Sequence, residues 1–534
     1  MSAKSHSLQR AQTNTTGQGG KGFTRFYRLL SKHPYLATLV VCVLLAPIYF
    51  CCTEASSDAM LCLAICIIVL AVLLACAFLL AAYKTQDAEK FACLLILAVG
   101  FAVKVIYAAG TSIYTRQNDV GDFTDEYTGH AGYIQYLMDY HQMPDFDPSE
   151  HWQFYHPPFH HIICAIWLTI WEDGFGITAA YAQESLQCLS LFYAMTIVIT
   201  CYRILRFFKV QGWPMYISLS IISFHPSLIQ FSGAINNDPL SVAFMMGAML
   251  TTLQWTREPT LKNILKIALC VGLGMMTKLS AAAIAIPIAL IFLYMLVKLW
   301  KTWKWKLIGH YAAFLAVCVP LGTWNSIRNL ILFDLPLGYV QEMSLTSSQY
   351  TGDQSFWSRI TDWEITTPFL QFTSKGAEEN DVNPLLGALK SSLFGEVNLA
   401  YDMTNWLSIL AFVLFWVNVV LALLGLIALV ASMFLKDGRM NYMDKSFFLC
   451  FYLVMMITFY SLSISSPFVC SMNYRYITPT FMLCAMAIGI CLQHLQEKTK
   501  ARQRAMYKGS VAIVGGVTLV FVFLVLVFYI NLIL

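Results

Sequence analysis

Charged residues are scarce in this sequence. Only 12% of its 534 residues are Asp, Glu, Lys or Arg, whereas 58% are hydrophobic. A soluble protein of this length carries roughly twice that fraction of charge, so the composition excludes an ordinary soluble enzyme. The formal net charge of +4 is small, and it indicates no nucleic-acid partner.

Several familiar catalytic motifs are also missing. The chain has no Walker A loop, no GxSxG and no HExxH, which excludes the enzyme classes built on those motifs. Sixteen cysteines are present, but none forms a CxxC pair and most stand inside apolar runs. We therefore interpret the cysteines as small buried hydrophobic residues rather than as disulfides or metal ligands.

Long hydrophobic runs, by contrast, recur along the whole chain. Runs of about 20 apolar residues are typical of membrane-spanning helices, and the sequence predicts an all-α polytopic membrane protein. Thirteen spans are expected, at 34–52, 59–83, 91–110, 183–204, 213–232, 240–256, 263–277, 279–298, 306–326, 404–434, 446–464, 476–494 and 509–532.

The connectors between these spans alternate in charge. Most of the 34 Lys and Arg fall in the N-terminal tail and in loops near 84–90, 202–210, 257–266, 298–306, 436–445 and 498–508. Basic loops stay on the cytoplasmic side. This predicts a cytoplasmic N-terminus and an outer C-terminus, with most of the 30 carboxylates on the outer side.

The predicted organisation has five parts. They are a disordered basic tail (1–33), two N-terminal spans (34–90), a membrane module (91–328), an outer loop or small cap (329–403) and C-terminal spans (404–534). The module includes a large outer loop, 111–182, in which 129–140 and 159–171 have the pattern of helices lying along the interface.

A dense group of carboxylates opens this loop, in "NDVGDFTDE". Its members are Asp119, Asp122, Asp125 and Glu126, and the basic residue after Arg116 is Arg203. Uncompensated charge of this density sits in water, holds a metal or takes part in chemistry. The loop also holds His156 and other histidines, and histidine with carboxylate suits several divalent ions, but no HExxH or comparable spacing appears. We therefore predict neither a metal nor another cofactor.

Four basic residues stand near the predicted outer ends of spans: Lys104, Lys278, Arg328 and Arg475. Charge at membrane depth is costly and is usually functional. Together they predict an anion site, and a lipid phosphate is the anion found at that depth.

Polar and aromatic residues add to this site. Asn237 and Asp238, in "INNDPLS", either form a simple turn or face the same cavity as the acidic cluster, and we also assign His156 and Tyr474 to that cavity. Four aromatic residues of the loop could stack on a bound substrate, although anchoring at the interface is the favoured interpretation; they are Tyr133, Tyr136, Trp152 and Tyr155.

Five motifs occur in an order that resembles a known family. They are "NDVGDF…GHAGYIQYL", "YHPPFHHIICAIW", "INNDPLS", "GMMTKLSAA" and "NYRYITPTFML". The arrangement resembles the GT-C glycosyltransferases, in the branch with protein O-mannosyltransferases, lipid A aminoarabinose transferases and rhizobial lipopolysaccharide transferases.

The resemblance implies a polyprenyl-phosphate monosaccharide as donor. The acceptor would be a hydroxyl of a glycan, lipid or protein, glycosylated with inversion on the outer or lumenal face. It also implies a carboxylate base early in the first outer loop. We choose Asp119, which opens the acidic cluster just after the third span, and the pair Asp125–Glu126 is the alternative match. We expect the base to take the acceptor proton, helped by a carboxylate cluster without basic partners, while the four cations hold the phosphate.

Two other classes remain open. A secondary transporter or lipid flippase also needs intramembrane charge, but such proteins usually place it near mid-membrane and show inverted repeats. A non-catalytic scaffold would not need the acidic cluster. The only N-glycosylation sequon begins at Asn14, in the predicted cytoplasmic tail. Outer loops free of sequons favour a bacterial plasma membrane, with the endoplasmic reticulum as the alternative.

Overall fold

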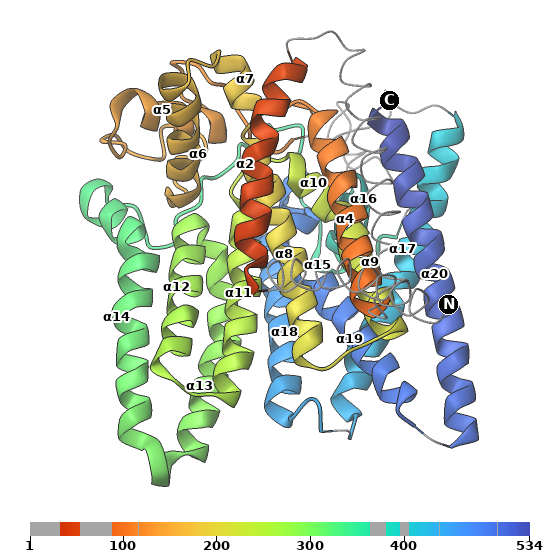
Figure 1. Cartoon of the computed structure of the whole chain (residues 1–534). Coiled ribbons are helices and arrows are strands. Elements are labelled where there is room, and N and C mark those ends of the chain that lie inside the picture. The colour runs from red at the N-terminus through yellow and green to blue at the C-terminus, as the bar shows by residue number, and fades with distance from the viewer. Residues whose placement is uncertain are drawn as a thin grey trace, which may run out of the picture.

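The computed structural model describes residues 32–53, 88–115, 117–363, 381–395, 405–436, 438–498 and 500–533. Within these ranges the chain is helical, without a strand, and its helices form one bundle (Figure 1). The all-α prediction is therefore confirmed. Nearly all of the predicted tail, the whole of the predicted span 59–83 and part of the predicted cap lie outside the described residues.

The helices follow the apolar runs of the sequence. In chain order they are α2 (Pro34–Thr53), α4 (Ala88–Ala109), α5 (Gly129–Tyr140), α6 (Phe159–Thr169), η1 (Ile170–Gly174), α7 (Ala179–Glu184), α8 (Gln187–Phe207), α9 (Trp213–Phe224), α10 (Pro226–Gly233), α11 (Asp238–Arg257), α12 (Leu261–Thr277), η2 (Leu279–Ile284), α13 (Ala285–Lys298), α14 (Trp300–Phe333), α15 (Phe356–Thr361), α16 (Pro384–Phe394), α17 (Asn405–Phe434), α18 (Tyr442–Ser465), η5 (Val469–Met472), η6 (Tyr474–Ile477), α19 (Pro479–Gln496) and α20 (Ala501–Ile533).

Eight helical stretches in the described part are long and apolar enough to cross a membrane. They are Ala88–Ala109, Ala179–Phe207, Leu279–Lys298, Trp300–Phe333, Trp406–Phe434, Tyr442–Ser465, Val469–Gln496 and Ala501–Ile533. The chain is thus an integral membrane protein with multiple spans, and the count of thirteen stays a prediction.

One predicted span is two helices. The run 213–232 breaks at His225, whose backbone is extended (φ −64°, ψ 128°), and α10 starts at Pro226. A residue that precedes proline avoids the helical conformation, so His225 ends α9. The break turns α10 toward the outer end of the bundle, where it helps to enclose the polar site described below.

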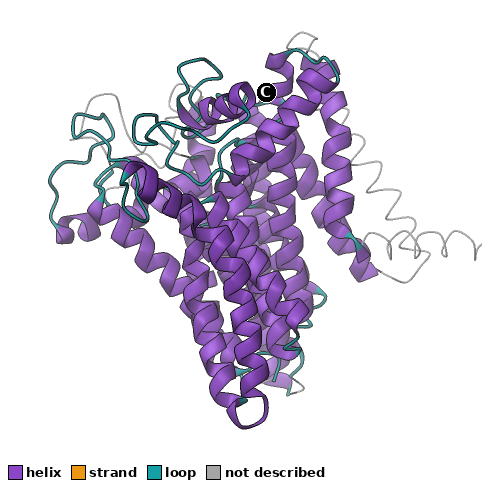
Figure 2. Cartoon of the chain, turned by 90° about the vertical axis from the view of Figure 1, so that its left-hand side faces the viewer, coloured by secondary structure: helices purple, strands orange, loops and turns teal. Residues whose placement is uncertain are grey.

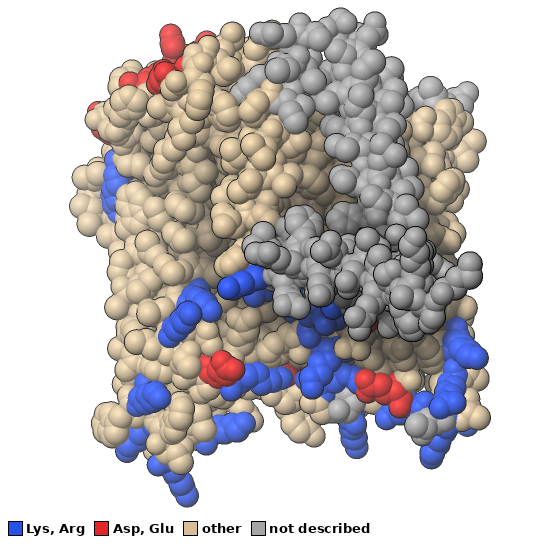
Figure 3. All heavy atoms as spheres, viewed as in Figure 1, with Lys and Arg blue, Asp and Glu red and all other residues tan. Residues whose placement is uncertain are grey.

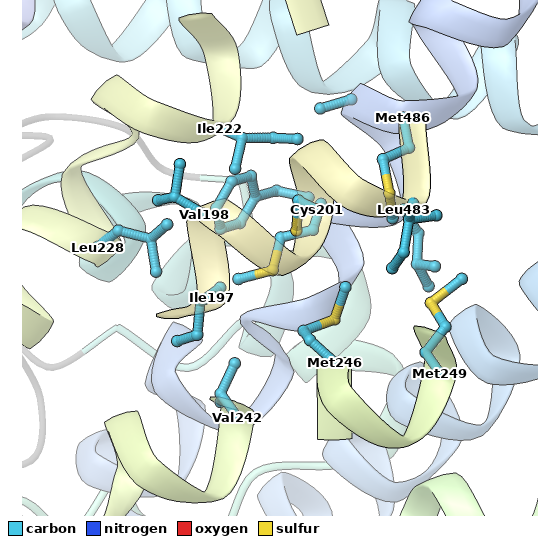
Figure 4. Close-up of a cluster of buried hydrophobic side chains, with 14 of the residues drawn as sticks. Ile197, Val198, Cys201, Ile222, Leu228, Val242, Met246, Met249, Leu483 and Met486 are labelled. Atoms are coloured by element: carbon cyan, nitrogen blue, oxygen red, sulfur yellow. The ribbon is translucent and has the colours of Figure 1, made fainter. Parts of the chain in front are cut away.

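The main core lies where α8, α9, α11 and α19 meet. Figure 4 shows Val198 and Cys201 of α8 near Ile222 of α9, with Met246 of α11 and Leu483 of α19 nearby. All five are buried, and Cys201 packs here as the small hydrophobic residue that the sequence predicted. This core fixes the helices whose outer ends carry the site.

Close packing of α12 against α14 explains Gly272, the first glycine of "GLGMM", whereas the second, Gly274, packs against Phe244 of α11. A Cβ built on Gly272 would lie 2.9 Å from the Cβ of Leu321, and one on Gly322 would lie 2.9 Å from the sulfur of Met275. Small residues at such crossings let helix backbones approach one another in membranes. The two helices thereby form a stable support for Lys278, which follows α12 directly.

The first outer loop has its own hydrophobic core. Helices α5 and α6 pack against each other at the upper end of Figure 1, and Tyr133 stacks on Phe154 with ring centroids 4.5 Å apart. Tyr133 and Tyr136 are both buried in this cluster, so they serve packing rather than contact with a sugar. Trp152 is exposed. The predicted helix 159–171 is α6 continued by the π-helical turn η1.

Charge is distributed unevenly between the two ends of the bundle. In Figure 3 most of the visible Lys and Arg gather at the lower end, while acidic residues lie along the upper edge over α5 and α6. Figure 2 shows long connecting loops at the upper end of the bundle, and the C-terminus lies at the same end. This distribution matches the charge asymmetry from which the sequence predicted that the first loop and the C-terminus are outer.

Candidate functional site

Four charged residues from distant parts of the chain meet at the upper end of the bundle. Arg475 of η6 places Nη2 2.7 Å from a carboxylate oxygen of Asp119 and Nη1 3.7 Å from one of Asp238. Lys278, between α12 and η2, places Nζ 2.5 Å from the other oxygen of Asp238. Two anions and two cations thus form one connected cluster, which we call the charge cluster.

The loop before α5 is folded to point Asp119 at Arg475. Asp119 and Gly121 both have left-handed backbone (φ 59° and 66°), and Asp tolerates this conformation better than most residues. The peptide N–H of His130 donates to the carbonyl of Asp119 (3.1 Å) and closes the loop. A Cβ on Gly121 would lie 1.8 Å from the carbonyl oxygen of Thr128. Only glycine therefore fits there.

This geometry separates Asp119 from the other acids of its cluster. The side chain of Asp119 is 23% exposed and paired with Arg475, whereas Asp122, Asp125 and Glu126 are exposed. The expectation that the acids have no basic partner was wrong for Asp119. Its partner comes from far along the chain, and a search of neighbouring sequence could not find it.

The Asn-Asp turn serves both purposes considered for it. The side-chain oxygen of Asn236 accepts the peptide N–H of Asp238 (3.1 Å), as turn chemistry requires, and the Asp238 carboxylate is 4% exposed and faces Lys278. Asn237 donates its side-chain amide to the carbonyl of Thr277 (3.1 Å). The start of α11 is thereby fastened to the residue just before Lys278.

Tyr476 is a site residue that the sequence analysis missed. Its ring centroid lies 5.1 Å from both the Lys278 ammonium and the Arg475 guanidinium carbon, and its hydroxyl accepts from Arg475 Nη2 (3.1 Å). The choice of Tyr474 in the same motif was wrong. The Tyr474 hydroxyl forms a hydrogen bond with the Thr480 hydroxyl (3.1 Å), and its ring stacks on that of His225. Tyr474 therefore lines a different, mostly apolar cavity of about 110 Å³.

Tyr155 and His156 lie beside the charge cluster in uncharged form. Burial raises the pKa of the Tyr155 hydroxyl above its usual range, and the negative charge of Asp119 raises it further. Burial lowers the pKa of His156 well below its ordinary value, as does the positive charge of Lys278. The two rings pack with centroids 4.2 Å apart. Tyr155 and His156 therefore place polar groups beside the charge cluster without changing its net charge.

Two of the predicted phosphate-binding residues lie elsewhere. Lys104 is fully buried and donates to the carbonyls of Ser223 (2.5 Å) and Gly100 (3.3 Å), which joins α4 to α9. Arg328 donates to the carbonyl of Pro144 and so holds the outer end of α14 to the first loop. Neither side chain is placed in the charge cluster, because depth along a span does not specify the face of the helix.

Amide side chains line a small polar pocket next to the cluster. Gln117, Asn118, Asn236 and Asn473 surround it together with Arg475. Its cavity volume is about 30 Å³, which is room for roughly two water molecules. The described residues contain no group of three or more His, Cys, Asp or Glu side chains arranged to hold a metal ion.

The second outer loop covers this region from the other side. Tyr339 packs edge-on against Tyr155 (6.2 Å), and Gln341 donates to the carbonyl of Ser149 (3.1 Å). The peptide N–H of Val469 donates to the carbonyl of Gln349 (2.9 Å). The described part of this loop therefore contacts both the first outer loop and the segment that leads to Arg475, which suits the predicted cap.

Residues 155–324 match the model of the dolichyl-phosphate-mannose-protein mannosyltransferase family. This range contains Asp238 and Lys278 but neither Asp119 nor Arg475. No curated protein sequence matches the chain.

Solved structures give weaker likenesses. The apo oligosaccharyltransferase of Archaeoglobus fulgidus is 12% identical, with 83% of this chain and 56% of that protein covered and a TM-score of 0.46. ArnT from Cupriavidus metallidurans, also apo, is 13% identical, with 80% and 76% covered and a TM-score of 0.33. This chain spans just over half the length of the archaeal enzyme.

Proposed function

We propose that this chain, a membrane glycosyltransferase of the GT-C superfamily, moves one sugar from a polyprenyl phosphate to an acceptor hydroxyl with inversion. The family match supports the superfamily and glycosyl transfer. The donor, the stereochemistry and the roles of individual residues are the proposal. The observation that supports the proposal is the charge cluster, in which the carboxylates of Asp119 and Asp238 share one site with the cations Lys278 and Arg475.

Glycosyl transfer with inversion is a single displacement. The acceptor oxygen bonds to the anomeric carbon as the bond from that carbon to the phosphate oxygen breaks, and the acceptor proton needs a base. Asp119 is the partly exposed carboxylate of the charge cluster, so a hydroxyl entering from the outer side reaches it. A positioned carboxylate of this kind contributes typically 10²–10⁴-fold to rate.

The leaving group is a lipid phosphate, which needs positive charge rather than a proton. Arg475 and Lys278 supply two cations at the outer end of the bundle, with side chains 6% and 10% exposed. Arginine binds phosphate with a planar fork and lysine as a point charge. Asp238 contacts both cations and orients them, since a buried cation requires a partner while no substrate is bound.

The transporter alternative gains no support from the intramembrane lysine. A transport path needs charged side chains that line a route for the solute. Lys104 instead donates to two backbone carbonyls in the packed interior. The structure thus gives Lys104 a role in joining helices.

The test is a transfer assay with purified protein. Polyprenyl phosphates that carry radiolabelled sugars are supplied with a membrane lipid extract, and label leaving the donor is measured for wild type and variants. We expect Asp119→Asn to lower the rate by about 10²-fold or more. Asp125→Asn tests the other candidate base, and Glu150→Gln, an exposed carboxylate of the same loop, is the matched control.

Full activity in Asp119→Asn together with loss in Asp125→Asn would move the base to Asp125. A wild-type protein that carries label across vesicles without breaking the sugar–phosphate bond would favour the transporter class instead.

A further inference from the structure

The pairing of Asp119 with Arg475 conflicts with the tasks proposed for both residues. Arg475 Nη2 has two hydrogens, and it contacts the Asp119 carboxylate at 2.7 Å and the Tyr476 hydroxyl at 3.1 Å. Both hydrogens are therefore in use. A phosphate that approaches Nη2 has to displace one of these partners, and the one Asp119 oxygen that contacts Arg475, Oδ2, is not available to an acceptor hydroxyl while the pair is intact.

Asp119 is the partner more easily displaced from Arg475. It stands in a loop, in left-handed backbone, with its side chain 23% exposed. Asp238 is only 4% exposed, is also held by Lys278 at 2.5 Å and begins a helix. The positive end of that helix dipole favours a carboxylate at the position of Asp238. Tyr476 follows Arg475 directly in the chain and packs under both cations.

We propose that the Asp119–Arg475 ion pair is a latch that the donor phosphate opens. This proposal rests on the proposed function. The phosphate takes the place of the Asp119 carboxylate on Arg475, and the released carboxylate turns to the acceptor hydroxyl. The exchange makes and breaks no covalent bond, because one anion replaces another on the same guanidinium.

The latch gives the reaction an order. Before the donor arrives, Asp119 and Asp238 balance the charges of Arg475 and Lys278, so the site is electrically neutral. The donor adds negative charge and frees one carboxylate, so the base becomes available only when a sugar is in place. The Asp119 carboxylate also competes with the donor phosphate for Arg475. The free energy needed to break the ion pair therefore weakens donor binding.

Competition predicts an unusual effect of removing the base. Asparagine has the shape of aspartate but no charge, so Asp119→Asn leaves Arg475 easier for a phosphate to engage. The probe is a sugar-free polyprenyl phosphate, and its dissociation constant is measured with the purified full-length chain. We expect Asp119→Asn to bind it about two- to fivefold more tightly than wild type, as expected when a partly exposed ion pair no longer has to be broken.

Two further variants control for other effects. Glu150→Gln removes one outer-loop charge away from the cluster, and its affinity should equal that of wild type. Asp119→Ala removes the carboxylate without the amide of asparagine, and it should also bind more tightly if competition is the cause. Equal or weaker binding by both Asp119 variants, with Tm values like wild type, would overturn the latch.

The outcomes separate this proposal from the proposed function. If wild type transfers sugar and the Asp119 variants bind polyprenyl phosphate with wild-type affinity, the latch is refuted and the proposed enzymatic function stands. If wild type neither binds polyprenyl phosphate nor transfers sugar, both the latch and the proposed function are refuted.

Discussion

The buried Lys278–Asp238 pair offers a prediction with a large expected effect. Asp238→Ala leaves the Lys278 ammonium, with its side chain 10% exposed, without the carboxylate that lies 2.5 Å away. It also removes the carboxylate oxygen 3.7 Å from Arg475. Removing one partner of a buried ion pair costs about 3–5 kcal/mol because an uncompensated charge stays behind. Thermal unfolding of the purified protein in detergent should show this as a clear fall in apparent Tm.

A double variant then separates stability from chemistry. Asp238→Leu combined with Lys278→Met replaces the pair by apolar side chains of similar size, which in other proteins is often neutral or stabilising. Its Tm should return close to wild type, while sugar transfer stays at least about 10²-fold reduced because a phosphate-binding cation is gone. A Tm for Asp238→Ala equal to wild type would refute the stabilising role of Asp238. Normal transfer by the double variant would refute the catalytic role of Lys278.

Three further predictions concern the surroundings of the site. Tyr476→Phe loses the hydroxyl that accepts from Arg475; steady-state kinetics should show a several-fold higher KM for the donor with little change in Tm, and an unchanged KM would contradict this role. Gly121→Ala puts a Cβ 1.8 Å from a carbonyl oxygen, so both Tm and activity should fall, and retention of both would contradict the loop geometry. Burial lowers the pKa of His160 from 6.5 to about 4. Unfolded chain therefore binds more protons between these values, and about 3 kcal/mol of stability present above pH 6.5 is lost toward pH 4. Apparent Tm should fall over this range, and less in His160→Gln; equal falls would contradict the assignment.

The sequence predicted the bundle well because its signals are local. Apolar runs set the helices, and the described ones fall close to the expected spans, apart from the break at His225. A signal for that break was present in Pro226, since a residue before proline is rarely helical. Charge asymmetry also predicted that Asp119, Lys278 and Arg475 lie toward the same outer end, and the structure brings these three together.

The predictions that failed concern which face of a helix a residue occupies and which residues pair across long stretches of sequence. Lys104 lies in an apolar helix with no polar stripe to mark a face, so the sequence could not show that it points into the packed interior. Tyr474 and Tyr476 flank Arg475, and only the 3₁₀ turn of η6 decides which of them packs under the cations. The pairing of Asp119 with Arg475 depends on contacts between two segments that are far apart in the sequence, which no local pattern encodes.

The roles of the charge cluster are tested most directly by a structure of the protein with a polyprenyl phosphate bound. The account predicts phosphate oxygens at about 3 Å from Lys278 Nζ and the Arg475 guanidinium, with the Asp119 carboxylate moved off Arg475. A phosphate bound instead at Arg328 or Lys104, with the Asp119–Arg475 pair intact, would contradict it.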